Sequence, residues 1–304
     1  MGEDDVTLRV DSISKSFGDF AAVDDLSFNV RAGRIFGFLG PNGAGKTTTI
    51  RMIVGITIPD SGEIELFGKR INGTAQDHIG YLPEERGLYK KTKVVDQLRY
   101  FAALKNVPQK EADRRIDRWM DRMALSEWKN KKTTDLSKGM QQKIQFIATV
   151  LHDPDLLILD EPFSGLDPVN VEFMIDVLAE FRQSHKTVIF STHLMETAER
   201  LCHDILLVNK GKKVLAGSLR EVKESYGRNR VAIRVDGAHD LLNNFSGVES
   251  IEEKADEKIL SMRSDADPQE LLRSLVSSGA TVTKFAYVEP TLNDIFIEQI
   301  GGAK

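Results

Sequence analysis

Gly40-Pro41-Asn42-Gly43-Ala44-Gly45-Lys46-Thr47 decides the fold of this chain, because it matches the phosphate-binding loop pattern G-x-x-x-x-G-K-[ST]. The compact apolar run at 34–39 predicts a strand before it, and a predicted helix begins near Gly45. Glycines let the backbone curl until its N–H groups converge on phosphate oxygens, and the helix N-terminus adds partial positive charge. A chance glycine-rich turn is the alternative, and the strand–loop–helix context argues against it. We expect Lys46 to face the phosphates and Thr47 to offer its hydroxyl to Mg²⁺.

A second element is an apolar strand that ends in two carboxylates. Residues 156–159 read Leu-Leu-Ile-Leu, and Asp160 and Glu161 follow directly. We expect Asp160 to hold Mg²⁺ through water and Glu161 to polarise the attacking water. Apolar strands often end in acidic turn residues, so the pair alone is a weak signal. Its place downstream of a phosphate-binding loop favours nucleotide hydrolysis.

Between these two elements lies Leu136-Ser137-Lys138-Gly139-Met140, followed by a helical stretch. It resembles the LSGGQ signature of ABC ATPases, with lysine and methionine at two of the five places. Ser137 and the backbone of Gly139 would sit at a helix N-terminus, which suits a γ-phosphate. An ordinary helix cap is the alternative for an isolated pentapeptide. The position between the other two elements favours the signature.

Further ABC elements appear in order along the chain. Residues 164–167, Ser-Gly-Leu-Asp, resemble the D-loop that crosses between two cassettes and ends at Asp167. His193 follows a predicted strand at 187–191 and resembles the switch histidine that contacts the γ-phosphate, although a lone histidine is more often structural. Phe17 resembles the aromatic residue that stacks on adenine; a core phenylalanine is the alternative, and Phe20 competes for the role.

One loop departs from the family pattern. After Gly-Tyr-Leu-Pro at 80–83, ABC ATPases carry a glutamine that helps to ligate Mg²⁺ and senses the membrane partner. Here Glu84 stands in its place, followed by Glu85 and Arg86. Glu84 is either a metal ligand or a solvated loop charge paired with Arg86. This form resembles bacterial exporter ATPases of sodium, antibiotic or peptide efflux, and residues 289–296 resemble the tail of the accessory domain that those ATPases carry.

The resemblance covers nearly the whole chain and implies an α/β fold, a P-loop NTPase ABC cassette at 1–227. The cassette would contain a RecA-like core, an antiparallel β-subdomain and a helical subdomain at about 92–150, with Thr92 as a predicted N-cap. ATP and Mg²⁺ would bind between two cassettes of a homo- or heterodimer. Closing and reopening of that dimer would drive a separate integral-membrane permease in solute export.

The resemblance also assigns roles to individual residues. Catalysis is assigned to Lys46, Glu161 and His193, and metal binding to Thr47, Asp160 and Glu84. ATP binding is assigned to Phe17, Gly40, Pro41, Asn42, Gly43, Ala44, Gly45, Lys46, Thr47 and Thr48. Contact with the ATP of the second cassette is assigned to Ser137, Lys138 and Gly139, and contact between cassettes to Asp167.

A change of composition after Gly227 predicts a second domain at 228–304. Residues 230–235, 248–252, 258–263 and 281–287 each alternate apolar and polar side chains, as half-buried strands do. Asp267-Pro268 begins a helix, and a shorter helix is expected at 239–242. The order β-α-β-β-α-β predicts a small α+β domain of the ferredoxin-like type.

Composition limits the other function classes. The 304 residues carry a formal net charge of -5, which argues against a nucleic-acid partner. Cys202 is the only cysteine, which fits a reducing cytosol. Residues 1–5 lack the layout of a signal peptide, and no apolar run approaches the roughly 18 residues of a spanning helix. We therefore expect a cytoplasmic protein held on the inner face of the membrane by its permease.

Three rival functions remain. An ABC ATPase without a transport role, with a regulatory C-terminal domain, is the main one, although such proteins usually carry two cassettes or a long coiled-coil insertion. A P-loop GTPase would need an Asn-Lys-x-Asp motif, and Asn209-Lys210-Gly211-Lys212 lacks the aspartate. A regulatory module that hydrolyses ATP would add to transport rather than replace it.

Overall fold

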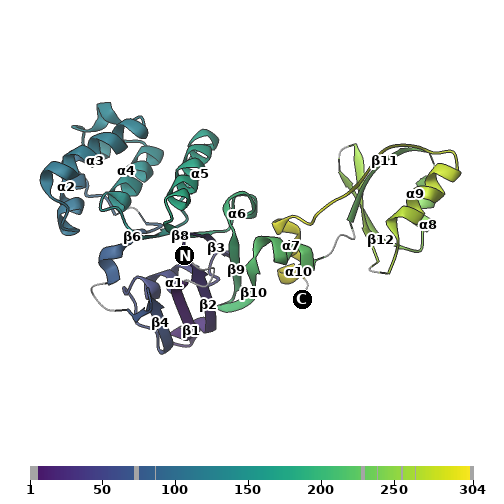
Figure 1. Cartoon of the computed structure of the whole chain (residues 1–304), viewed down its shortest axis with the longest axis horizontal. Helices are drawn as coiled ribbons and strands as arrows, with labels where there is room; N and C mark the ends of the chain where they lie inside the picture. Colours follow the sequence, from purple (N-terminus) through teal and green to yellow (C-terminus); the bar gives the residue numbers. More distant parts are fainter. Residues whose placement is uncertain are drawn as a thin grey trace. The chain divides into compact units, whose positions relative to one another are not determined.

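The computed structural model describes residues 6–71, 75–85, 87–226, 230–237, 239–254, 256–263 and 265–301. The chain forms two compact units, Met1–Ser218 and Leu219–Lys304 (Figure 1). The expected boundary at Gly227 lies outside the described residues, and the division falls earlier because helix α7 (Leu219–Ser225) belongs to the second unit. No helix in the described ranges is long and apolar enough to cross a membrane.

A six-stranded sheet forms the centre of the first unit, with the order β10-β9-β3-β8-β7-β6. Its strands are β3 (Ile35–Leu39), β6 (Ile79–Leu82), β7 (Leu156–Asp160), β8 (Thr187–Thr192), β9 (Asp204–Asn209) and β10 (Lys212–Ser218). All neighbours are parallel except β9 and β10. Strands β3, β7 and β8 are buried along their whole length, as strands covered on both faces must be. Their carboxyl ends therefore meet at one edge of the sheet.

An antiparallel sheet covers one side of this core, with the order β2-β1-β4-β5. It contains β1 (Val6–Phe17), β2 (Phe20–Arg31), β4 (Ser61–Leu66) and β5 (Lys69–Arg70). One buried cluster joins both sheets to helix α1 (Lys46–Ile53), and within it Phe28 of β2 stacks on Phe36 of β3 at 5.6 Å. The first helix after the glycine-rich loop is thus fixed by packing from two sheets.

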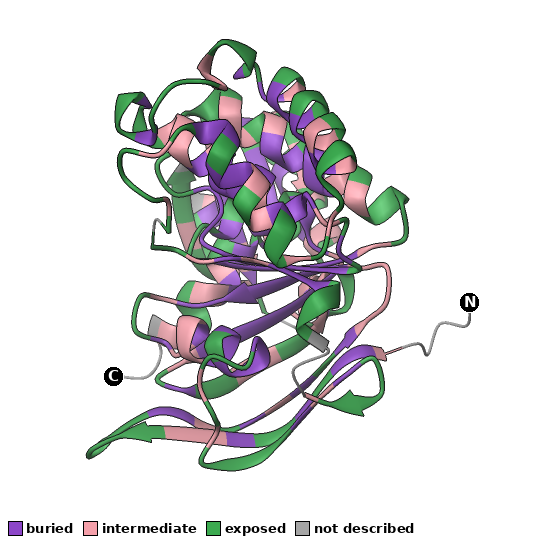
Figure 2. Cartoon of the chain, turned by 90° about the vertical axis from the view of Figure 1, so that its left-hand side faces the viewer, coloured by how far each residue is buried: buried purple, intermediate pink, exposed green. Residues whose placement is uncertain are grey.

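Helices cover the other side of the parallel sheet, and buried residues lie where the helices pack against the sheet (Figures 1 and 2). They are α2 (Val94–Leu104), α3 (Gln109–Arg122), α4 (Lys138–Val150), α5 (Pro168–Gln183) and α6 (Met195–Leu201), with short 3₁₀ turns η1 (Ala75–His78), η2 (Ser126–Trp128) and η3 (Thr133–Asp135). Trp119 of α3 packs against Phe146 of α4 and Phe181 of α5, with ring centroids 5.9 and 6.1 Å away. The aromatic cluster joins three helices into one layer.

The prediction of Thr92 as a helix N-cap is wrong. Helix α2 begins one residue later, with Lys93 at the N-cap and no side-chain cap bond. The backbone carbonyl of Thr92 instead accepts hydrogen bonds from the N–H of Thr133 at 3.2 Å and the amide of Gln97 at 3.4 Å. These contacts hold Thr92 in the connection that precedes the helix.

The second unit is an antiparallel sheet with helices on it. Its elements after α7 are β11 (Arg230–Asp236), α8 (His239–Asn244), β12 (Val248–Lys254), β13 (Glu257–Met262), α9 (Pro268–Ser277), β14 (Thr281–Tyr287) and α10 (Leu292–Gly301). From β11 to β14 the element order is β-α-β-β-α-β, as expected. The sheet order is β12-β13-β11-β14. Asp267 caps α9 as expected, accepting a bond from the N–H of Gln269 at 2.9 Å. Leu260 and Leu271 lie in the separate core of this unit.

Candidate nucleotide site

The loop between β3 and α1 can be built only with glycine at two places. Gly40 has φ 153°, and a Cβ there would lie 2.4 Å from the carbonyl oxygen of Val208. Gly45 has φ 103°, and its Cβ would lie 2.5 Å from the carbonyl oxygen of Ala22. Both approaches are shorter than any side chain tolerates, and positive φ disfavours other residues. The close packing therefore fixes a tight loop that leads directly into α1.

Lys46 is buried at the base of this loop. Its ammonium donates hydrogen bonds to the carbonyl oxygens of Gly40 at 2.8 Å and Pro41 at 3.2 Å. The same Nζ lies 3.6 Å from Oε1 of Glu161. A buried ammonium must be paired and hydrogen-bonded, and here both conditions are met within the loop and by the neighbouring strand. The arrangement places one fixed positive charge where phosphate oxygens would enter.

Glu161 stands at the centre of the site. It is 7% exposed and adopts φ 48°, a left-handed conformation that costs a residue with a side chain about 1–3 kcal/mol and that clusters at functional sites. Its N–H donates to Oγ of Ser191 at 3.0 Å. Its Oε1 lies 3.1 Å from Nδ1 of His193. The carboxylate is thus held between Lys46 and His193, three expected catalytic residues brought together from three elements.

Ser191 is a site residue that the sequence pattern did not identify. Its hydroxyl donates a short hydrogen bond to the carboxylate of Asp160. Asp160 and Ser191 are register partners on the adjacent strands β7 and β8. A polar residue near the carboxyl end of an apolar strand was the available signal, but only the sheet order shows which carboxylate it meets.

Two buried glutamines of α4 were also not identified. The amide of Gln142 lies 3.4 Å from the carbonyl oxygen of Pro162, directly after Glu161. The amide of Gln145 lies 3.3 Å from the carbonyl oxygen of Glu85. Their i, i+3 spacing, which places both on one side of the helix, was the signal. They hold α4 against the loop that follows β7 and the loop that follows β6.

The residues fit a magnesium ion bound with a nucleotide. Oδ2 of Asp160 is buried and has no hydrogen-bond partner among the described residues. Thr47 is half-buried in the first turn of α1. Within the described ranges no three acidic, histidine or cysteine side chains gather into a metal cage. Mg²⁺ needs no such cage, because it is usually held by one or two carboxylates together with waters and substrate phosphates.

Glu84 is not joined to these residues. Its side chain is exposed, and no described residue pairs with it. Arg86, the alternative partner, lies outside the described residues. The loop itself follows β6, whose carboxyl end lies next to β7 and so beside Asp160.

The signature residues lie on the surface at the start of α4. Ser137 caps this helix by accepting a bond from the N–H of Met140 at 3.2 Å, and Lys138 is exposed. A Cβ on Gly139 would lie 3.8 Å from the carbonyl oxygen of Gly165, so the signature packs beside the expected D-loop. Asp167 in turn caps α5, accepting from the N–H of Asn170 at 3.0 Å, and this bond lowers the pKa of Asp167.

Both candidate adenine-stacking residues are exposed at one end of the β1–β2 hairpin. Phe17 is 55% and Phe20 is 62% exposed, so neither is a core phenylalanine. The ammonium of Lys15 lies 5.8 Å from the centre of the Phe17 ring. Because Ala22 packs on Gly45, the hairpin runs beside the phosphate-binding loop. The remaining loop residues expected to bind ATP, Asn42, Gly43, Ala44 and Thr48, all lie between β3 and the first turn of α1.

Comparisons with known proteins identify the family of the chain. Residues 23–164 match the ABC transporter family, and residues 217–300 match the C-terminal domain of DrrA1-3-like ATP-binding proteins. An uncharacterized ABC transporter ATP-binding protein of Bacillus subtilis, YhaQ, is 45% identical over 97% of this chain and 98% of its own length. The Nod factor export ATP-binding protein I of Ralstonia nicotianae is 32% identical over 97% of this chain and 94% of its own.

A solved structure described as the ATP-binding subunit of an ABC transporter superimposes with a TM-score of 0.68. It is 30% identical and covers 72% of this chain and 93% of its own. The family match, the relatives and the fold all indicate the same family. The chain belongs to the ABC transporter ATP-binding proteins, and it is the ATP-hydrolysing subunit of a transporter.

Proposed function

We propose that this chain hydrolyses MgATP between two cassettes and thereby powers solute export through a separate membrane permease. The observation that carries the proposal is the convergence of Lys46, Glu161 and His193 at the carboxyl edge of the parallel sheet. Ligands of open α/β sheets bind at that edge.

The phosphates bind in the loop 40–48, where backbone N–H groups and the start of α1 face them. Lys46 supplies the point charge for the β- and γ-phosphates. Thr47 and Asp160 hold Mg²⁺, which neutralises phosphate charge when it is bound, and Glu84 is a third candidate ligand. Phe17 stacks on the adenine ring, with Phe20 as the competing residue.

Glu161 is the general base in this proposal. Its carboxylate accepts a proton from the attacking water, and His193 contacts the γ-phosphate and holds the carboxylate in place. The bond from the N–H of Glu161 to Ser191 fixes the strained backbone from which this side chain projects. Glu161 needs this fixed position because a general base must lie within hydrogen-bond reach of the water.

A second cassette completes the site. Ser137, Lys138 and Gly139 lie at the N-terminus of the 13-residue helix α4, where anions are favoured. Ser137 and Lys138 are exposed in the single chain, so they are accessible to the ATP of a facing cassette. Gly165 and Leu166 pack beside Gly139, and Asp167, which follows them, is the proposed cassette contact.

The transport direction and the partner rest on the relatives. The similarity to a Nod factor export protein over nearly its whole length supports export. A permease would hold this subunit on the inner face of the membrane. We also propose that the second unit is the ferredoxin-like accessory domain of such exporters, and its match to DrrA1-3-like proteins supports this.

The test separates ATP binding from hydrolysis. We expect Lys46→Ala to lose both, and Glu161→Gln to keep ATP binding while phosphate release slows by roughly 10²–10⁴. Glu172→Gln is the matched control, because Glu172 is exposed and, within the described ranges, its side chain pairs only with Arg200 at the surface. Normal phosphate release by Glu161→Gln would remove Glu161 from the catalytic role and contradict the proposed mechanism.

A further inference from the structure

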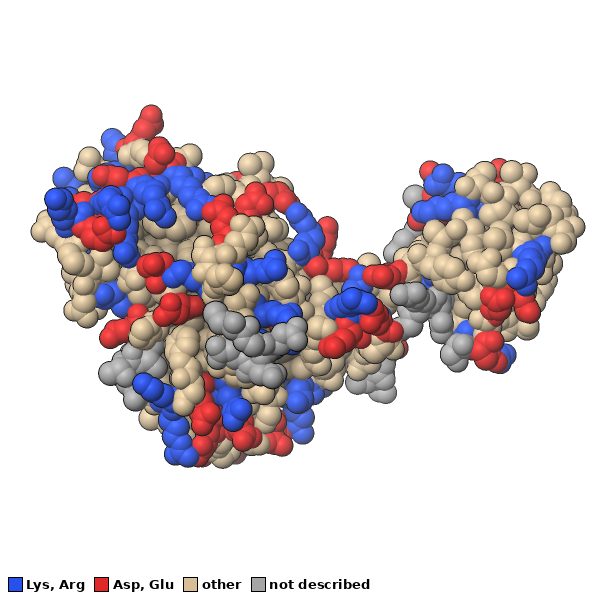
Figure 3. All heavy atoms as spheres, viewed as in Figure 1, with Lys and Arg blue, Asp and Glu red and all other residues tan. Residues whose placement is uncertain are grey.

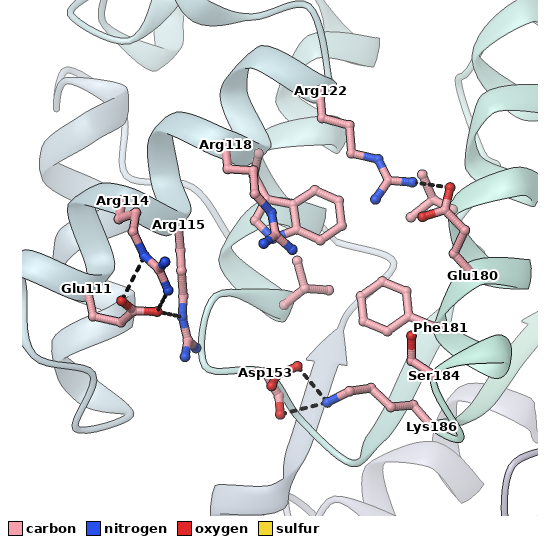
Figure 4. A pocket seen from close by; sticks show the side chains of 13 residues that line it. Glu111, Arg114, Arg115, Arg118, Arg122, Asp153, Glu180, Phe181, Ser184 and Lys186 are labelled. Atoms are coloured by element: carbon pink, nitrogen blue, oxygen red, sulfur yellow. Dashed lines mark hydrogen bonds and ion pairs between the residues drawn. The ribbon is translucent and has the colours of Figure 1, made fainter.

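A cavity lies in the first unit at the edge of the parallel sheet opposite the candidate nucleotide site. Its volume is about 370 Å³, and α3, the end of α4, α5 and the segments before β7 and β8 line it (Figure 4). Asp153 and Lys186 precede these two strands, whereas Glu161 and His193 follow them. A five-residue strand such as β7 spans roughly 16 Å, so one small ligand cannot fill both sites.

Cationic side chains outnumber carboxylates in this cavity. Five cationic side chains and three carboxylates line it, an excess of two positive charges. Four of the cations are arginines of α3, and Lys186 faces them from the segment before β8. Basic side chains also gather over α3 on the molecular surface (Figure 3). The whole chain is acidic, so this concentration of positive charge runs against its average composition.

One carboxylate in the cavity serves two arginines. Glu111 accepts hydrogen bonds from Arg114 at 2.8 Å and from Arg115 at 2.7 Å. Arg114 and Arg115 together lower the pKa of Glu111 to about 2. A single negative charge therefore faces two guanidinium groups at every pH near neutrality.

In the part of the chain that the structure describes, no carboxylate pairs with Arg118. Arg122 pairs with Glu180 at 2.5 Å and Lys186 pairs with Asp153 at 2.6 Å. Among the residues that the structure describes, no hydrogen bond or ion pair reaches Arg118, and no dashed line does so in Figure 4. Its five N–H donors remain available to a ligand.

An aromatic wall lies beside these charges. The rings of Trp119 and Phe181 stack with centroids 6.1 Å apart and planes 6° apart. Val150 and Val177 extend the apolar part of the lining. The cavity thus offers an apolar wall and a cationic rim, the usual design of a site for a small organic anion.

We propose that this cavity binds a small phosphate-bearing molecule, with Arg118 as its principal contact and Arg115 and Lys186 as flanking cations. The volume admits a small molecule. The excess of two cations matches the charge of a phosphate monoester, and a planar guanidinium grips phosphate oxygens bidentately. Because α3 and the segment before β8 both contribute, the bound anion links the helical layer to the sheet.

The test uses the full-length chain with the substitution Trp128→Phe. The chain has two tryptophans, so Trp119 then remains as the single fluorescent reporter. Saturating ADP fills the phosphate-binding loop, and inorganic pyrophosphate is then titrated at constant ionic strength. We expect a saturable change in Trp119 fluorescence. Arg118→Gln should raise the half-saturating concentration about tenfold or more, because a charge-assisted bond is lost. Arg118 is exposed, so its substitution should leave the melting temperature nearly unchanged.

Arg70→Gln is the matched control. It removes the same charge from the same unit, its side chain is 74% exposed, and it lies on β5 away from the cavity. The proposal is overturned if pyrophosphate gives no saturable change, or if Arg118→Gln and Arg70→Gln behave alike. Binding to phosphatidic acid vesicles without a response to free pyrophosphate would assign the cations to a membrane surface, and it would also overturn a small-molecule site.

Discussion

The hydroxyl of Ser191 donates a hydrogen bond to the carboxylate of Asp160, and it joins two neighbouring parallel strands at their carboxyl ends. The same oxygen accepts the N–H of Glu161 at 3.0 Å. One fully buried side chain therefore orients a candidate metal ligand and the candidate general base.

We expect Ser191→Ala to lower the stability of the protein and to weaken its use of Mg²⁺. Its loss leaves a buried acceptor and a buried donor without their partner, which should lower the free energy of unfolding by about 1–3 kcal/mol. The Mg²⁺ concentration for half-maximal hydrolysis should rise, because Asp160 is no longer held in one orientation. Chemical denaturation and a Mg²⁺ titration measure the two effects. Ser126→Ala, at an exposed serine without a side-chain bond among the described residues, should change neither.

Glu84→Gln tests whether the exposed glutamate reaches the metal when nucleotide is bound. Since the substitution removes a negative charge, a metal ligand at this place should require severalfold more Mg²⁺ for half-maximal hydrolysis, with little change in maximal rate. Glu85→Gln is the neighbouring control, because Glu85 is also exposed. An unmoved titration curve for Glu84→Gln would exclude the metal role and leave a contact with the permease.

Removal of the second unit should spare nucleotide binding. A chain that ends at Ser218 keeps every motif and the whole core cluster of the first unit. We expect it to fold and to bind ATP with an affinity within a few-fold of the full chain, as measured by thermal melting and calorimetry. A chain that ends at His203 lacks β9, a buried central strand, and should not fold. Aggregation of the Ser218 chain would show that the second unit is part of the core.

The strands that carry the motifs could be predicted because each is a short apolar run that stops at a glycine or an acid. Strands β3 and β7 are of this kind. Strand β6 could not be predicted, since it has only four residues and contains Gly80, which looked like part of a loop. Gly80 is required there by close packing, because a Cβ would lie 2.6 Å from the carbonyl oxygen of Thr149.

The residues that support the site, Ser191 and Gln145, could not be predicted from the sequence, because their partners are distant along the chain. Ser191 and Asp160 are 31 residues apart, and only the order of strands in the sheet makes them neighbours. The same holds for Gln145, whose partner Glu85 is 60 residues away. Motif residues could be predicted because their chemistry fixes their spacing, whereas these residues depend on tertiary packing alone.

The central claim is that ATP is held between two cassettes and hydrolysed with Glu161 as base. The most direct measurement is the oligomeric state of the Glu161→Gln protein, determined by size-exclusion chromatography with and without MgATP. We expect a monomer without nucleotide and a stable dimer with MgATP, because binding closes the pair and the next step is blocked. Adding Ser137→Arg should abolish the dimer while ATP still binds to the phosphate-binding loop. A Glu161→Gln chain that binds MgATP and remains a monomer would contradict the account.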